Sequence, residues 1–106
     1  MTYWVGVAPG VWREAASVTE YYLSRASVEV ASRFLDELGD AINSLEEMPS
    51  RFRNVEEFEA RRVPLRSFPY LLWYRVLDDQ QVVLVAALSH AAMSSRSVMR
   101  LIRGGG

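Results

Sequence analysis

The hydrophobic pattern of this 106-residue chain changes its period once, close to Pro49, and that change restricts the folds open to the chain. Before Pro49, apolar residues recur every three or four positions over residues 11–22 and 31–48, which predicts two amphipathic helices. Ser27 is a candidate N-cap for the second helix, and Pro49 should end that helix. Because the link between the two helices is short, we expect an antiparallel hairpin.

After a polar loop at residues 49–58, the pattern becomes that of β-strands rich in β-branched and aromatic side chains. Turn residues 77–80 join the last two strands, and the final run is apolar throughout, as in a strand covered on both faces. The order strand–helix–helix–strand–strand–strand predicts an α+β fold, with the helical hairpin packed on one face of an antiparallel sheet. The expected strands are residues 2–7, 60–66, 70–76 and 81–88.

The C-terminal end of the chain is its least regular part. The segment from His90 onward fits either a short helix or an additional strand. Neither a repeat nor a linker interrupts the sequence, so we expect residues 1–103 to form one domain. Gly104, Gly105 and Gly106 are expected to form a flexible tail.

Composition excludes several kinds of chemistry. The chain has no cysteine and one histidine, so it can build neither a thiol nucleophile nor a multi-histidine metal site. No glycine-rich phosphate loop and no G-x-S-x-G motif is present. We therefore expect no metal and no cofactor, and we assign no catalytic residue. Without disulfides, a long apolar run or a leader pattern, the sequence favours a cytoplasmic protein with no membrane partner.

All twelve basic residues are arginines, and they are distributed unevenly in a chain whose net charge is only −1. Residues 1–48 hold three arginines against eight acids, whereas residues 49–106 hold nine against five. Such asymmetry is typical of a surface for nucleic acid or for an acidic partner. Arginine binds phosphates and carboxylates through paired hydrogen bonds, so the arginines of the predicted strands and tail are candidate contacts. They are Arg61, Arg62, Arg66, Arg75 and Arg96.

The arrangement of these candidates can be predicted in part. Strand alternation places Arg62 and Arg66 on one face of the sheet and Arg61 on the other. The alternative, which stays open, is a solvated sheet edge guarded by charge against aggregation. His90, directly after the last strand, is a further candidate for proton transfer or partner contact, and its alternative is a structural bond to the backbone.

Several segments, in order and with consistent spacing, carry a resemblance to a known family. They are Glu14-Ala15-Ala16 with Tyr21-Tyr22, Ala31–Leu38, Met48-Pro49, Arg61–Leu65, Phe68–Val76, Asp78-Asp79, and Val82–Ala87 with His90. Together they resemble the RelE/ParE superfamily, the toxins of bacterial type II toxin–antitoxin systems. The resemblance covers nearly the whole chain and implies a fold of the same layout. It also implies a cognate antitoxin as partner, whose C-terminal segment wraps the toxin in a hetero-oligomer and neutralises it.

The resemblance implies more than one activity. RelE-like members cut messenger RNA on the ribosome with basic residues, usually helped by a C-terminal tyrosine, whereas ParE-like members inhibit DNA gyrase. This chain has Leu71, Ala92 and Met93 where RelE-like toxins carry basic residues. It also has no lysine, and no tyrosine follows Tyr74. The segment His90–Arg96 instead resembles the His-x-x-Met-polar-x-Arg ending of some ParE-like toxins.

We therefore expect a ParE-like inhibitor of DNA gyrase that acts by binding rather than by catalysis. Its candidate target-binding residues are the five arginines above and His90. Two alternatives stay open: a RelE-like, ribosome-dependent mRNA endonuclease, and a non-toxic member of the family that acts only as a protein-binding module. The sequence does not assign the residues that bind the antitoxin.

Overall fold

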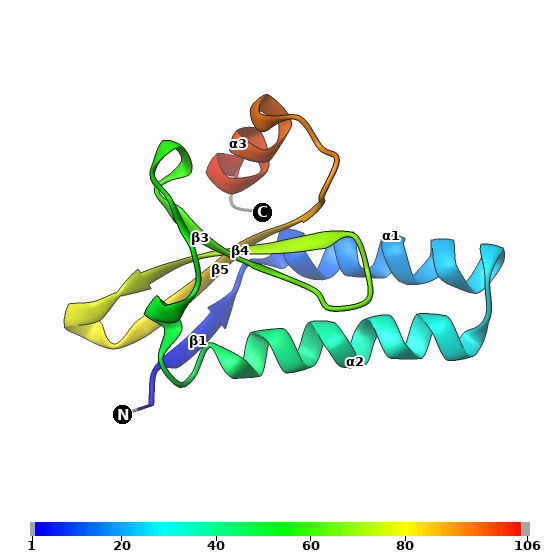
Figure 1. Cartoon of the computed structure of the whole chain (residues 1–106), viewed down its shortest axis with the longest axis horizontal. Helices are drawn as coiled ribbons and strands as arrows, with labels where there is room; N and C mark the ends of the chain where they lie inside the picture. The colour runs from blue at the N-terminus through cyan, green and yellow to red at the C-terminus, as the bar shows by residue number, and fades with distance from the viewer. Residues whose placement is uncertain (1, 105–106) are drawn as a thin grey trace.

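A computed structural model describes residues 2–104, in which three helices pack on a five-stranded sheet (Figure 1). The α+β class expected from the sequence is confirmed. The helices are α1 (Pro9–Arg25), α2 (Val28–Ser44) and α3 (Ser95–Gly104). The strands are β1 (Trp4–Val7), β2 (Asn54–Val55), β3 (Ala60–Pro64), β4 (Tyr70–Leu77) and β5 (Val82–His90). Short 3₁₀ turns lie at Pro49–Arg51, Glu56–Phe58 and Asp78–Gln80.

The order of the sheet is β1-β5-β4-β3-β2, and the sheet is mixed rather than fully antiparallel. β1 runs parallel to β5, with Trp4 opposite Val82 and Val7 opposite Val85. The expectation of an antiparallel sheet is wrong at this edge. A tight turn forces its two strands to be antiparallel, but β1 and β5 are separated in the sequence by the helical hairpin and the other three strands, which permits parallel pairing.

The boundaries of the helical hairpin follow local chemistry. Pro9 occupies the first turn of α1, and the Ser27 hydroxyl accepts a hydrogen bond of 3.1 Å from the Val30 N–H at the start of α2, as expected for an N-cap. α2 ends at Ser44, earlier than Pro49 suggests. Met48, directly before Pro49, is exposed and adopts the left-handed conformation.

The main core lies between the hairpin and one face of the sheet. Phe34 and Leu35 both fit the apolar spacing of α2, and the structure buries Phe34 while leaving Leu35 45% exposed. The Phe34 ring makes edge-on contacts with Phe68 and Tyr70, at centroid distances of 5.5 and 5.7 Å. Such pairs add to the burial energy of the rings, so Phe34 joins α2 to the loop between β3 and β4 and to the first residue of β4.

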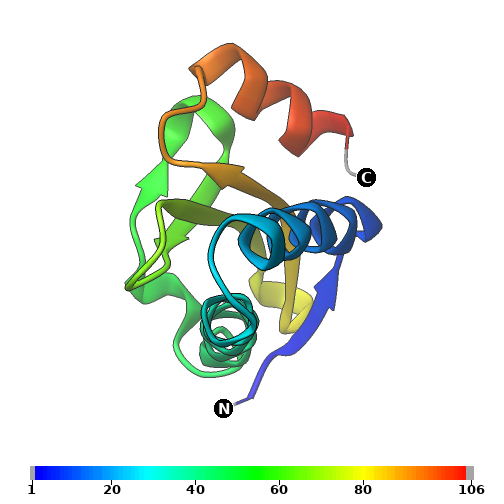
Figure 2. The same ribbon diagram turned by 90° about the vertical axis from the view of Figure 1, so that its right-hand side faces the viewer.

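The opposite face of the sheet is covered by α3 (Figure 2). The segment after His90 therefore forms a short helix and not an additional strand. Its inward side chains, Val98 and Ile102, pack in a second apolar cluster with Phe58, Trp73 and Ala87. Because α1 contacts one face of β5 and α3 the other, the prediction that the last strand is covered on both faces is confirmed.

One irregularity in β5 allows it to serve both layers. Ala86 has no direct partner in β4, because Trp73 lies opposite Ala87 while the next residue, Tyr74, lies opposite Val85. This extra residue, a β-bulge, shifts the alternation of side chains by one position. Val83 and Val85 face the hairpin before the bulge, and Leu88 faces it afterwards. A regular strand would turn Leu88 towards α3.

The described part of the chain ends within the glycine-rich C-terminus. Gly104 is helical, contrary to the expectation of a flexible tail at residues 104–106, and residues 105–106 lie outside the described part of the chain. No helix among residues 2–104 combines the length and apolar character needed to cross a membrane.

Truncating Phe34 should destabilise the protein far more than truncating its neighbour. We expect Phe34→Ala to lower the free energy of unfolding by about 3–5 kcal/mol, because a large cavity opens between α2 and the sheet. Leu35→Ala, the matched control, should change it by about 0.5 kcal/mol or less. Urea denaturation followed by circular dichroism measures both, and equal effects would contradict this description of the core.

Candidate target-binding site

The sheet separates the six candidate residues into two groups. Opposite residues on antiparallel strands share a face, so Arg62, opposite Trp73, lies on the side of α3. Arg75 is on the same side, where it lines a groove with Leu84 and Ile102, and Arg96 belongs to α3 itself. Arg61, Arg66 and His90 lie on the side of the helical hairpin. The six side chains therefore do not form one continuous site.

Two of the candidates hold loops in place. The Arg61 guanidinium donates from Nη1 to the backbone carbonyls of Ser50, at 3.0 Å, and Phe52, at 2.8 Å. Arg75 donates from Nε to the Glu59 carbonyl at 2.9 Å and from Nη2 to the Phe58 carbonyl at 3.5 Å. Hydrogen bonds from a charged donor stabilise such turns, so both side chains have a structural task that sequence spacing does not reveal.

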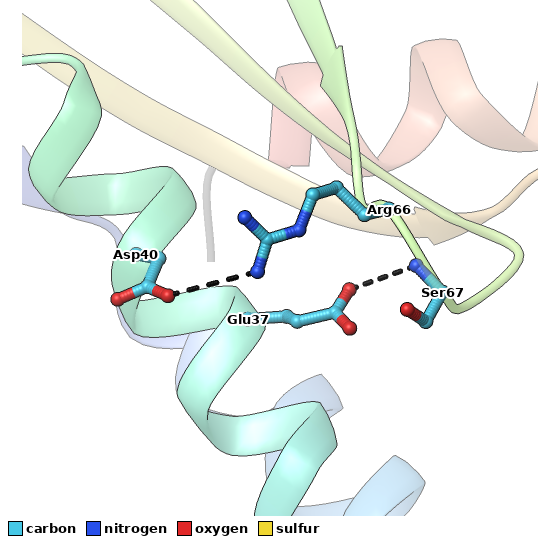
Figure 3. A network of polar contacts seen from close by, with 4 residues as sticks. All are labelled: Glu37, Asp40, Arg66 and Ser67. Carbon is cyan, nitrogen blue, oxygen red and sulfur yellow. Dashed lines mark hydrogen bonds and ion pairs between the residues drawn. The ribbon is translucent and has the colours of Figure 1, made fainter.

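Arg66 lies in the loop between β3 and β4 rather than on the sheet (Figure 3). Its Nη2 is 3.9 Å from Asp40 Oδ2 of α2, and both side chains are exposed. The expectation that Arg62 and Arg66 share a face is therefore wrong. β3 ends at Pro64, which has no N–H to continue a ladder, so strand alternation does not extend to residue 66.

Glu37, one turn before Asp40 on α2, fastens the same loop (Figure 3). Glu37 is buried, and its Oε1 accepts a hydrogen bond of 2.9 Å from the Ser67 N–H. Burial raises the pKa of Glu37, but the hydrogen bonds from Ser67 and the charge of Arg66 lower it more, so the pKa lies below its ordinary value. The buried carboxylate is charged and partnered at neutral pH.

His90, at the end of β5, makes a structural hydrogen bond to the backbone. Its Nδ1 accepts a hydrogen bond of 3.0 Å from the Ala92 N–H, which ties the turn that leads into α3. Its ring makes an edge-on contact with Tyr70 at a centroid distance of 5.2 Å. Since Nδ1 is an acceptor, the neutral ring carries its proton on Nε2.

Arg62 and Arg96 are the two candidates that hold no part of the fold. Among the described residues, neither side chain has a hydrogen bond or an ion pair. Sequence reasoning missed two further arginines of the same helix, Arg100 and Arg103, both exposed. Their spacing from Arg96 is four and seven residues, which identifies one face of a helix once the tail is known to be helical.

The face of the sheet beneath α3 is built mainly from apolar side chains. Leu71 is half-buried and packs on the second apolar cluster. The buried Ser89 hydroxyl accepts a hydrogen bond of 2.9 Å from Trp73 Nε1. Within residues 2–104, no three His, Asp or Glu side chains gather closely enough to hold a metal ion. The arginines of this face can bind anions.

Tyr74, although central in the sheet, is committed to the fold. Its hydroxyl donates a hydrogen bond to the Pro49 carbonyl. Burial raises the pKa of Tyr74 to about 12, in spite of the opposing charges of Arg61 and Arg51. The phenol therefore remains a protonated donor at physiological pH.

Solved structures with this architecture come from two kinds of toxin system. The chromosomal ParDE toxin–antitoxin system of P. aeruginosa gives a TM-score of 0.73 at 12% identity, over 84% of this chain and 96% of that chain. A mutant of the E. coli toxin RelE in the free state gives 0.60 at 20% identity, over 97% and 98%. At such identities the likeness concerns the fold, which is that of RelE/ParE superfamily toxins.

The sequence places the chain within that superfamily. The family model of the ParE toxin of the type II toxin-antitoxin system, parDE, matches residues 7–94. The chain therefore belongs to the ParE toxin family, which confirms the resemblance found in the sequence. A comparison with curated proteins gives no match. The family match ends at Ser94, so α3 lies beyond it.

Adjacent arginines of β3 should differ in their effect on stability. We expect Arg61→Gln to lower the free energy of unfolding by about 1–3 kcal/mol, because two backbone carbonyls lose a charged donor. Arg62→Gln should change it by about 0.5 kcal/mol or less, since no described group depends on that side chain. Thermal and urea unfolding of the two variants make the comparison. Equal losses would show that Arg62 also supports the fold.

The Glu37 carboxylate should contribute to the pH dependence of stability. Because its folded-state pKa is depressed, its contribution is present above the unfolded-state pKa and is lost as pH falls through the folded-state value. We expect Glu37→Gln, which keeps an acceptor for Ser67, to flatten the loss of stability between about pH 5 and 3. Asp36→Asn, an exposed control, should leave that slope nearly unchanged. An identical slope in Glu37→Gln and the wild type would contradict the assignment.

Proposed function

We propose that this ParE-family toxin inhibits DNA gyrase by binding and that a cognate antitoxin neutralises it. The observation that carries the proposal is the composition of the sheet face under α3. In RelE-like toxins that region supplies basic catalytic residues, whereas here Leu71 packs into an apolar cluster. Because the position that is basic in RelE-like toxins is here an apolar side chain committed to packing, binding is the activity that this surface supports best. Membership of the ParE family favours gyrase as the target.

Arg62 and Arg96 are the residues we assign to target binding. Both lie on the side of α3 and neither is used by the fold among the described residues. We do not assign the other three arginines to target binding. The guanidinium groups of Arg61 and Arg75 already donate to backbone carbonyls, and that of Arg66 pairs with Asp40. A guanidinium without an internal partner can bind a phosphate or carboxylate of the target without first breaking a bond.

An antitoxin segment has an apolar surface available to it. β1 is an end strand of the sheet, so its outer edge has no strand partner. Beside it, Trp4 is 68% exposed and lines, with Gly6, Leu84 and Ile102, a largely apolar groove of about 410 Å³. A partner segment that is disordered when free can fold over such a groove and add hydrogen bonds along the open edge.

The proposal is tested by adding purified protein to gyrase supercoiling and to ribosome-dependent mRNA cleavage. We expect supercoiling to fall while ribosome-bound message stays intact. Arg62→Gln with Arg96→Gln should raise the concentration for half-inhibition about tenfold or more, the effect of losing about 1.4 kcal/mol of binding. The matched control is Arg25→Gln with Arg33→Gln, which removes the same charge from the helical hairpin and should inhibit as the wild type does.

The other outcomes separate the alternatives. Intact supercoiling beside cleaved message would replace the proposal with a ribosome-dependent endonuclease. Normal growth of bacteria that express folded protein without an antitoxin would replace it with a protein-binding role. Where growth does stop, co-expression of the antitoxin should restore it.

A further inference from the structure

The outer face of α3 is a continuous positive surface that the fold does not use. At 3.6 residues per turn, Arg96, Arg100 and Arg103 fall within an arc of roughly 60°. Val98 and Ile102 occupy the opposite side of the helix and are buried against the sheet. All three guanidinium groups are on exposed residues, and none forms an ion pair with a described carboxylate. We call these three residues the arginine stripe.

The charge of α3 is opposite in sign to that of α2. α3 carries no acidic residue, and no aspartate or glutamate follows Asp79 in the sequence. α2 holds four acids and one arginine, and it lies on the other face of the sheet (Figure 2). α3 is therefore a positive element and α2 a negative one, while the exposed acids on the α3 side are those of the turn around Phe58, namely Glu56, Glu57 and Glu59. The positive charge of α3 attracts a polyanion during encounter.

The stripe is unfavourable for the helix that carries it. Arg96 lies in the first turn of α3, where the helix dipole is positive and an acidic residue would be stabilising. The three arginines also repel one another across spacings of three and four residues. Packing of Val98 and Ile102 offsets these costs, but an external anion would remove them.

We propose that the arginine stripe binds the phosphate backbone of duplex DNA, independently of whether the protein inhibits gyrase. From Arg96 to Arg103 the helix rises about 10 Å, close to three base-pair rises of 3.4 Å along one strand. Guanidinium groups bind phosphate oxygens through two parallel hydrogen bonds. Contacts of this kind fix a protein on the duplex without reading its sequence.

Duplex DNA fits the stripe better than single-stranded nucleic acid or an acidic protein. Single strands are held mainly by stacking on aromatic side chains, and the chain has no Phe, Trp or Tyr after Tyr74. A protein partner would need an apolar anchor among the charges, and the stripe has none, since Leu101 lies on another side of α3. The stripe also lies beyond the residues matched by the family model, so the family match does not assign it.

The test measures binding of a fluorescent 24-base-pair duplex by anisotropy between 50 and 200 mM salt. Three neutralised phosphates give a slope of about −2.7 in log affinity against log salt, so affinity should fall about 40-fold over this range. The variant R96Q/R100Q/R103Q should lose most of the binding and most of the slope. R100Q alone should reduce the slope by about 0.9.

The matched control is R25Q/R33Q/R53Q, which removes three exposed arginines outside the stripe. Its affinity and slope should stay close to those of the wild type, and circular dichroism should show that all variants are folded. Equal loss in both triple variants would overturn the assignment to α3, as would a flat salt dependence in the wild type. Tighter binding of single-stranded DNA or of polyglutamate than of the duplex would also overturn it. None of these results depends on the gyrase assay.

Discussion

The structure depends on the alternate packing of β4 into two apolar layers. Leu72 and Tyr74 point into the core under the helical hairpin, and Trp73, between them, points into the cluster under α3. All three are buried, so one short segment joins both layers. Burying each large side chain contributes about 1.5–3 kcal/mol, and the two layers cannot be separated without breaking this strand. The bulge at Ala86 keeps β5 in register with both layers.

The polar contacts hold the turns and loops around the two apolar layers. The Tyr74 hydroxyl holds the turn at Pro49, Trp73 Nε1 satisfies Ser89, and the buried Glu37 carboxylate holds the loop at Ser67. Each of these groups would be costly to bury without a partner. Arg61 and Arg75 do the same for backbone carbonyls of the segment between α2 and β3. Arg62 and the arginines of α3 have no such task among the described residues.

The arginines differ in whether the fold already uses their guanidinium groups. In the sequence, five of them had equal standing as target contacts. In the structure, Arg61 and Arg75 donate to backbone carbonyls and Arg66 pairs with Asp40, whereas Arg62 and Arg96 have no internal partner among residues 2–104. The family match supports a toxin of the ParE kind. The surface left free is suited to binding anions.

The sequence by itself determined the α+β class, the helical hairpin, its Ser27 cap and the cover of β5 on both faces. These features follow from local periodicity and capping chemistry, which neighbouring residues fix among themselves. Only the tertiary structure decided that β1 is parallel to β5, that the tail is a helix, and that Arg66 lies in a loop beside α2 while Arg62 lies on the sheet. Each of these depends on residues far apart in the chain: α3 is fixed by burial against Trp73, and Arg66 by an acid on α2.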